Sequence, residues 1–270
     1  LIDLEASHGM QALGSVMYPT NICSGCSFDT DLYGKMIALI AKELRLSGNH
    51  IGFMTIIDMA TDPRFGRTEE SFGEDPLLAS RMAFSAVKGF ERENTSICAK
   101  HFLAHGGATS GHMSGEVCSG MRNIREIHIP SAKAAIEAGA DLVMTAYNSI
   151  DGVLCVASKD ILTDLLRDEL GFEGVVMTDG GGVLKARDVV RGGADYLAAA
   201  VSLNAGNDVS LGDGFGVFLR LEEALEKDEI TEEKLDEAVR RVLLLKVKRQ
   251  LFDDPFLKPG HVVPFVKSGE

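Results

Sequence analysis

The sequence predicts an α/β fold in which parallel strands form a TIM-type (β/α) barrel that is incomplete, with about six strands where a full barrel has eight. Apolar, β-branched runs alternate with helical patterns in units of roughly 40 residues, which is typical of parallel strands joined by crossover helices. Polar residues follow directly after several of these runs. Barrel folds carry their functional groups at this position, so the polar clusters also indicate where the chemistry lies.

The strands are expected where short apolar runs end at polar or glycine-rich segments. Most of the runs are too short for a helix and are bounded by glycine or charged residues, which favours buried strands. The predicted strands cover residues 1–4, 51–57, 96–99, 140–146, 172–178 and 207–211.

The helices are expected where apolar residues recur every three or four positions, as Leu32, Met36 and Ile40 do. Pro130 interrupts or restarts the third helix, and Thr231 is a suitable N-cap for the last. The predicted helices cover residues 29–47, 76–90, 124–138, 159–170, 218–226 and 231–251. Together the elements form one barrel domain over 1–256, and the prolines beyond it predict an extended tail over 257–270.

The composition excludes several classes of protein. Hydrophobic residues make up 45% and charged residues 25% of the 270 positions, as in a globular domain with a substantial core. The net charge of -13, from 27 basic and 40 acidic residues, argues against nucleic acid or an anionic membrane surface as partner. No apolar run approaches the ~20 residues that a membrane-spanning helix needs. A neutral or cationic small molecule is the better expectation.

The five cysteines cannot all pair within the chain, and this odd count favours a reducing compartment such as the cytoplasm. Cys23 and Cys26 have the spacing of a redox or zinc motif, but no second pair of this spacing follows. We therefore expect no metal and no cofactor. Because the chain begins with Leu1 and not Met, we also expect that a segment preceding it has been removed.

The stretch at 62–76 carries the most specific pattern, DPRFGRTEESFGEDP. Pro63 and Gly66 disfavour a helix, so this is a loop between a predicted strand and a predicted helix. Loops in this place hold the functional groups of barrel folds. The spacing alone also allows a charged surface loop held by Arg–Glu pairs.

This loop resembles the signature of glycoside hydrolase family 3, which usually reads RDPRWGR, then E, then GEDP. Further segments agree with the family in the same order: AKHF at 99–102, VMTAYN at 143–148, ILTDLLR at 161–167 and GFEGVVMTD at 171–179. The resemblance runs from about Glu5 to Phe256 and is strongest to the β-glucosidases and β-xylosidases. It implies a retaining β-glycosidase that hydrolyses terminal β-linked glucosides or xylosides. The family's barrel begins earlier than Leu1, so its first βα unit is expected to be missing here.

Asp179 is the leading candidate for the reacting group. It follows the predicted strand at 172–178 and precedes three glycines, which leave room for a sugar ring. A carboxylate in this position can attack an anomeric carbon and form a glycosyl ester, and the resemblance aligns Asp179 with the family's nucleophile. As an alternative, Asp179 caps the next helix. A phosphate cradle at 180–182 is disfavoured because the charge of Asp179 would repel the anion.

The resemblance also implies roles for residues at other strand ends. Tyr147 aligns with the tyrosine that orients the nucleophile, and core packing is the alternative for Tyr147 and Met144. The positions aligned with sugar-binding residues or the pocket lining are Glu5, Arg67, Lys100, His101 and Met144.

The general acid/base is the missing part of this expectation. The family supplies it from a second domain or from an Asp-x-His pair in the loop after KHF. Here that loop holds His112 and Glu116, and Ser110 stands where the Asp of the pair would be. Both are candidates that do not match the pattern, so we expect a second domain or a partner subunit of a homo-oligomer to supply the acid. The alternative is a carbohydrate-binding or inactive glycosidase fragment.

A metal-dependent hydrolase is the rival hypothesis. His101, His105 and His112, with Glu116, are residues of the types that bind zinc. The H-x3-H spacing suits a helix face, but the glycines at 106 and 107 end any helix there. This hypothesis is therefore disfavoured.

Overall fold

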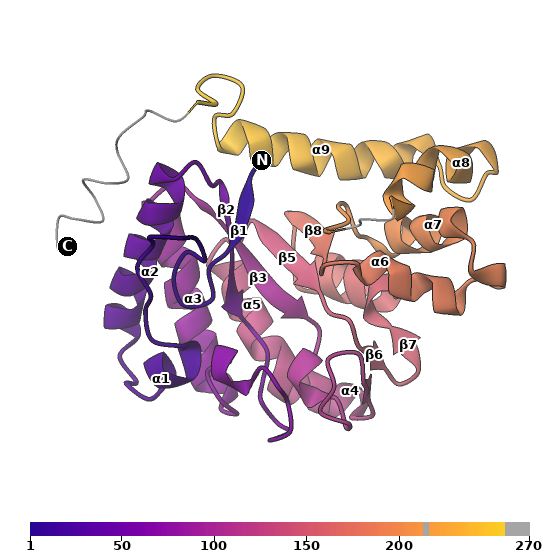
Figure 1. Ribbon diagram of the computed structural model, residues 1–270. Helices are drawn as coiled ribbons and strands as arrows, with labels where there is room; N and C mark the ends of the chain where they lie inside the picture. Colours follow the sequence, from indigo (N-terminus) through magenta and orange to yellow (C-terminus); the bar gives the residue numbers. More distant parts are fainter. Residues whose placement is uncertain (213–215, 257–270) are drawn as a thin grey trace.

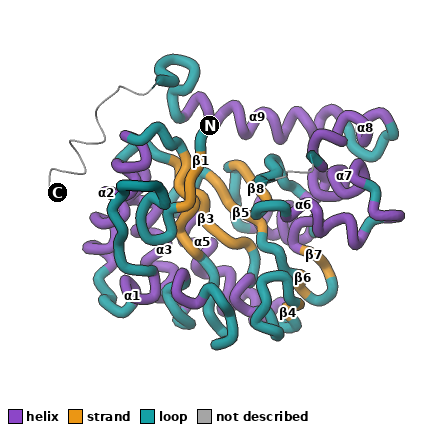
Figure 2. The backbone as a smooth tube through the Cα atoms, in the orientation of Figure 1, coloured by secondary structure: helices purple, strands orange, loops and turns teal. Residues whose placement is uncertain are grey.

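The structure, a computed structural model, describes residues 1–212 and 216–256 and is built on a curled, five-stranded parallel sheet (Figures 1 and 2). The strands lie side by side in chain order, which is the arrangement of a half-barrel. They are β1 (Asp3–Glu5), β2 (Ile51–Ile56), β3 (Ser96–Phe102), β5 (Leu142–Thr145) and β8 (Val175–Thr178). The predicted incomplete barrel is confirmed. The strand predicted at 207–211 is reduced to one parallel bridge between Val209 and Met177.

The long helices begin where the side chain of the preceding residue can cap them. Asp29 accepts the amide N–H of Leu32 at the start of α2 (Thr30–Leu46), and Asp75 caps α3 (Pro76–Arg92). Thr231 caps α9 (Glu232–Lys248), as predicted. The helix expected over 124–138 begins with the π-helical turn Ile124–His128 and continues as α5 (Ile129–Glu137). The one expected over 159–170 is the π-helical segment Asp160–Glu169, and α8 (Leu221–Glu226) follows a 3-10 turn.

Apart from short helices and 3-10 turns, two parts of the fold were not predicted. One is α7 (Asp195–Ala205), which is lined mainly by alanines and packs into two apolar clusters, so it has no polar stripe for the periodicity to detect. The other is a small second sheet made of β4 (Glu116–Val117), β6 (Ser149–Ile150) and β7 (Val153–Leu154). The remaining helices are the short α1 (Asn21–Gly25), α4 (Gly120–Asn123) and α6 (Gly182–Lys185).

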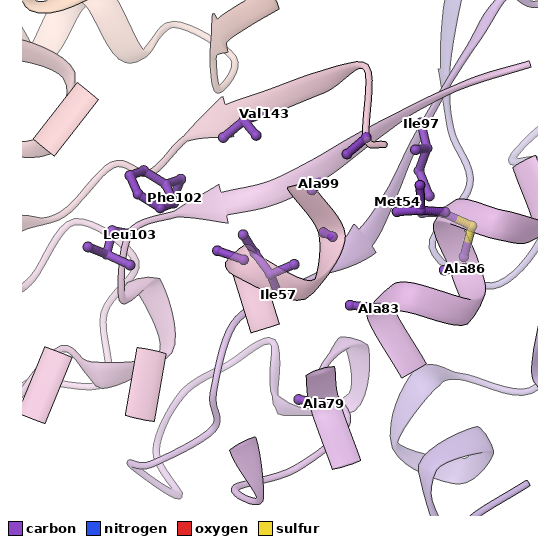
Figure 3. Packing of buried hydrophobic residues seen from close by; sticks show 14 of the residues in the cluster. Met54, Ile57, Ala79, Ala83, Ala86, Ile97, Ala99, Phe102, Leu103 and Val143 are labelled. Atoms are coloured by element: carbon purple, nitrogen blue, oxygen red, sulfur yellow. The ribbon is translucent and has the colours of Figure 1, made fainter. Parts of the chain in front are cut away.

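Successive strand residues point to opposite faces of the sheet, and each face has its own core. On the outer face, Ile97 and Ala99 of β3 contribute to a cluster that includes Ala83 and Ala86 of α3 (Figure 3). On the inner face, Cys98 lies in a cluster with Met144, Met177 and Leu245 of α9.

Helix α9 crosses the end of the sheet at which the strands begin (Figure 1). Asp141, just before β5, binds Lys248 with Nζ–Oδ1 at 2.5 Å and also pairs with Arg249. Arg249 Nε donates to Ser96 Oγ at 2.6 Å, at the start of β3. Since α9 occupies this end, the carboxyl ends of the strands remain available for a site.

The predicted tail at 257–270 lies outside the described residues, and the single domain over 1–256 stays a prediction. None of the helices within the two described ranges is long and apolar enough to cross a membrane.

The packing of β2 against the helices can be tested at Gly52. A Cβ at this position would lie 2.6 Å from the ring of Phe90 and 2.8 Å from Leu44 Cδ1, and both side chains are fully buried. We expect Gly52→Ala to lower the free energy of unfolding by about 1–3 kcal/mol, measured by urea denaturation. Gly66→Ala is the matched control, because a Cβ there meets nothing within 4 Å. Equal effects of the two substitutions would contradict this account of the packing.

Candidate active site

The residues singled out in the sequence gather where the strands end. Glu5 closes β1, Lys100 and His101 lie in β3, and Asp179 follows β8. Tyr147 comes two residues after β5 ends. Because neighbouring parallel strands present their carboxyl ends at the same edge of a sheet, these side chains meet although long stretches of sequence separate them.

Asp179 presents an ionised carboxylate with one free oxygen. Its Oδ1 accepts the backbone N–H of Gly180 at 2.7 Å. Its Oδ2 is buried without a hydrogen-bond partner, 3.2 Å from Nε2 of His101. Burial alone would raise the pKa of Asp179, but the hydrogen bond from the Gly180 N–H and the positive charge of nearby Arg67 act against it, and the pKa lies well below its usual range.

Tyr147 and the glycines fix the turn that carries Asp179. The Tyr147 hydroxyl donates to the Gly180 carbonyl at 2.7 Å, and burial together with the negative charge of Asp179 raises the pKa of the phenol. Gly181 has φ of 69°, a left-handed conformation that favours glycine. The Gly182 N–H then donates to the Asp179 carbonyl at 2.8 Å. Tyr147 therefore holds the backbone on which the carboxylate stands.

His101 is held between two charged residues. Its Nδ1 lies 2.7 Å from Oδ2 of Asp58, and its backbone N–H donates to the same oxygen at 3.2 Å. On its other side, Nη1 of Arg67 lies 3.0 Å from Nε2. Burial would raise the pKa of Asp58, but the hydrogen bond from the His101 ring and the positive charge of Arg67 lower it, so the carboxylate is ionised and accepts a hydrogen bond from Nδ1–H.

Arg67 and Lys100 are each paired with a glutamate. Arg67 binds Glu70 through two parallel contacts, Nε–Oε1 at 2.6 Å and Nη2–Oε2 at 2.8 Å. Lys100, only 1% exposed, places Nζ 2.5 Å from Oε1 of Glu5. Ser7 Oγ lies 3.2 Å from Glu5 Oε2 and 3.4 Å from Glu70 Oε2, which links the two pairs. A hollow of about 260 Å³ opens beside them, lined by Glu5, Ser7, His8, Gln11, Arg67, Glu69 and Glu70.

Met144 lies apart from these polar groups. Its side chain is 1% exposed and belongs to the apolar cluster on the inner face of the sheet, with Phe53 and Cys98. This is a packing position, and the predicted role of Met144 in lining a sugar pocket stays a prediction.

The two acid/base candidates are not joined to Asp179. Glu116 accepts the backbone N–H of Gly152 at 2.6 Å and the hydroxyl of Ser149, so its carboxylate fastens the small second sheet. His112 is exposed in the loop before β4. Within residues 1–212 and 216–256, no hydrogen bond or ion pair connects either side chain to Asp179. Their role as proton donor stays untested.

The four residues of the metal hypothesis do not come together. Among the described residues, only Asp58, His101 and His105 form a group whose ligand-type atoms all lie within 4.8 Å of one another. The guanidinium of Arg67 touches this group, and its positive charge opposes a cation there. Burial lowers the pKa of His105 to about 4, so this ring is neutral, and it packs 4.4 Å from the ring of His101.

Sequence reasoning missed Asp58 and Glu70. Asp58 follows a buried strand just as Asp179 does, so the same positional argument could have found it. Glu70 stands three residues after Arg67, a spacing that allows the two side chains to meet. Glu70 was not distinguished from its neighbours by residue type alone, because the loop at 62–76 is rich in acids.

Comparison with known proteins decides the family. The profile of the "Glycosyl hydrolase family 3 N terminal domain" matches residues 1–245. The chain belongs to glycosyl hydrolase family 3. A β-xylosidase of Formosa agariphila is 31% identical over 92% of the chain and 38% of its own length. A periplasmic β-glucosidase of Salmonella typhimurium is 31% identical over 95% of the chain and 34% of its own length.

The fold agrees with solved structures of this family. A β-glucosidase of Listeria innocua in complex with gluconolactone superimposes with a TM-score of 0.92 at 32% identity, over 99% of this chain and 38% of that protein. This family 3 domain therefore spans little more than a third of the relatives that it matches.

The buried His105 predicts a specific pH dependence of stability. The unfolded chain protonates this imidazole near its ordinary pKa of 6.5, whereas the folded protein keeps it neutral down to about 4. The unfolded state thus binds more protons in this window, and stability falls as the pH falls from 6.5 towards 4. We expect His105→Gln to flatten this fall, measured as the free energy of unfolding between pH 6.5 and 5. A control variant, His112→Gln, changes an exposed ring and should keep the wild-type slope. An unchanged slope in His105→Gln would show that the ring is not held neutral.

Proposed function

We propose that this domain is the catalytic barrel of a retaining β-glycosidase that hydrolyses terminal β-linked glucosides or xylosides, with Asp179 as the nucleophile. The observation that carries the proposal is the free Oδ2 of an ionised Asp179 at the carboxyl ends of the strands. The names of the relatives, β-glucosidase and β-xylosidase, support the class of substrate.

The reaction takes two displacements. In the first, Oδ2 of Asp179 bonds to the anomeric carbon while the bond from that carbon to the leaving oxygen breaks, and the leaving group takes up a proton. In the second, a water molecule bonds to the anomeric carbon, the ester bond to Asp179 breaks, and the water loses a proton. The low pKa of Asp179 suits both steps, since the carboxylate must be charged to attack and must leave readily.

The charged pairs around Asp179 supply groups that can hold the sugar. Lys100 and Arg67 offer hydrogen-bond donors, whereas Nε2 of His101 and the carboxylate of Glu5, which is 41% exposed, offer acceptors. Because each of these side chains is already held by a partner, little ordering is needed when the sugar binds. Tyr147 keeps the Asp179 turn in place through the Gly180 carbonyl.

The proton donor is proposed to come from a further domain of the same protein or from a partner subunit. In support, Glu116 is bound within the small second sheet and His112 is exposed. The same observation favours the second candidate function, a domain that binds carbohydrate without turning it over alone.

The nucleophile is tested by Asp179→Asn, which keeps the shape of the side chain and removes its charge. We expect kcat/KM for an aryl β-glucoside to fall by about a thousandfold or more, with the fold unchanged by circular dichroism. A fluorinated activated glycoside should label the wild-type chain at Asp179, as read by peptide mass spectrometry. Asp62→Asn serves as the control, since this carboxylate pairs with Arg64 at the protein surface. A label on any other residue refutes the assignment.

The missing proton donor predicts that the rate of glycoside cleavage depends steeply on how readily the leaving group departs without a proton. Nitrophenolate needs almost no protonation when it departs, whereas a sugar alkoxide does. We expect this chain alone to cleave nitrophenyl glycosides far faster than disaccharides. Azide should accelerate turnover of the activated substrates, because it attacks the glycosyl ester without a general base. Normal hydrolysis of disaccharides that is lost in Glu116→Gln or His112→Ala would instead place the donor in the loop at 106–120.

A further inference from the structure

The carboxylate of Asp58 is the most deeply buried charge beside the site, and the mechanism above gives it no role. Its side chain is fully buried just beyond β2. One oxygen, Oδ2, takes both the ring Nδ1 and the backbone N–H of His101, at 2.7 and 3.2 Å. The other oxygen, Oδ1, is buried without a partner. All the hydrogen bonding of this carboxylate is therefore directed at one residue.

We propose that Asp58 is a positioning residue that fixes the tautomer and orientation of the His101 ring, and thereby keeps Oδ2 of Asp179 free to react. The proposal rests on the proposed function only for its effect on the reaction. The tautomer itself is a property of the folded chain.

The argument follows from what each ring nitrogen can do. An ionised carboxylate only accepts, so the contact with Asp58 requires the proton on Nδ1. The Arg67 guanidinium only donates, so its contact with Nε2 at 3.0 Å requires a lone pair on Nε2, and the ring is therefore singly protonated. In the opposite tautomer Nε2 would carry the proton. The N–H groups of Nε2 and Arg67 would then point at each other and repel. The Nε2 proton would hydrogen-bond to Asp179 Oδ2 instead, 3.2 Å away. The nucleophilic oxygen would be occupied and the arginine displaced.

The surroundings restrict the ring further. The ring centroid of the neutral His105 lies 4.4 Å from that of His101 and 5.5 Å from that of Phe65. Neither nitrogen of His105 has a hydrogen-bond partner, so His105 contributes packing and no competing hydrogen bond. In this buried environment the contacts with Asp58 and Arg67 determine which nitrogen of His101 is protonated.

The tautomer can be observed directly by NMR of the chain labelled with nitrogen-15 at histidine, with the His101 signals identified by their loss in His101→Gln. We expect wild-type Nδ1 to carry the proton and Nε2 to be of the unprotonated type. In Asp58→Ala and Asp58→Asn, we expect the Nε2-protonated form to appear. A proton on Nε2 of wild-type His101, with or without one on Nδ1, overturns the proposal without any variant of Asp58. An unchanged tautomer in the folded Asp58 variants also overturns it.

Kinetics separate this role from a structural one. We expect Asp58→Asn to lower kcat for nitrophenyl glycosides by about 10- to 100-fold, because the nucleophile is misplaced or occupied while the sugar still binds. Asp62→Asn, an isosteric change in the same loop, should leave both the rate and the tautomer unchanged. A folded Asp58→Asn with wild-type kcat overturns the proposal. If the chain proves to have no glycosidase activity, the proposed function fails, and the NMR result still decides the state of His101.

Discussion

Charges that are taken out of water must find partners inside the protein, and this constraint shapes the site more than any other. Lys100 is 1% exposed and the side chain of Asp58 is fully buried. Lys100 of β3 pairs with Glu5 of β1, and Asp58, in the loop after β2, pairs with His101 of β3. The pairs form a continuous set, in which removing one member leaves a charge without compensation. The carboxylate of Asp179 has its low pKa because it lies within this set.

The two faces of the sheet show how a half-barrel is stabilised. The outer face packs against helices in the usual way, with alanines of α3 allowing close approach. The inner face, which the opposite strands of a closed barrel would fill, has Leu245 of α9 in its cluster. Asp141 and Asp208 anchor this helix through ion pairs with Lys248 and Arg241. The site at the opposite end is thus supported by a helix that takes no part in it.

Much of the architecture follows from patterns that are local in the sequence. The sequence predicts the strands at 51–57, 140–146 and 172–178 because buried parallel strands are uniformly apolar. It predicts the capped helices because a capping residue stands directly before an apolar pattern of helical period. Helix α7 was missed because it is mostly apolar and its few polar residues do not form a stripe with a helical period. In the site, the positions of the residues at the ends of the predicted strands indicate which side chains meet. They could not predict that Asp58 binds His101 or that Ser7 joins two ion pairs, because those contacts depend on side-chain directions across distant segments.

The position of α9 also has a consequence for how the chain acquires its fold. Arg249 bonds to Ser96 across 153 positions of sequence, and Lys248 bonds to Asp141 across 107. Contacts between such distant residues form late, after the loop between them has been closed. Until α9 has been synthesised, Cys98, Met144 and Met177 have no covering helix, and the growing chain presents an apolar sheet surface to its surroundings. Translation must therefore pass residue 249 before the domain can reach its native state, and a nascent chain stopped earlier is a substrate for chaperones or aggregation.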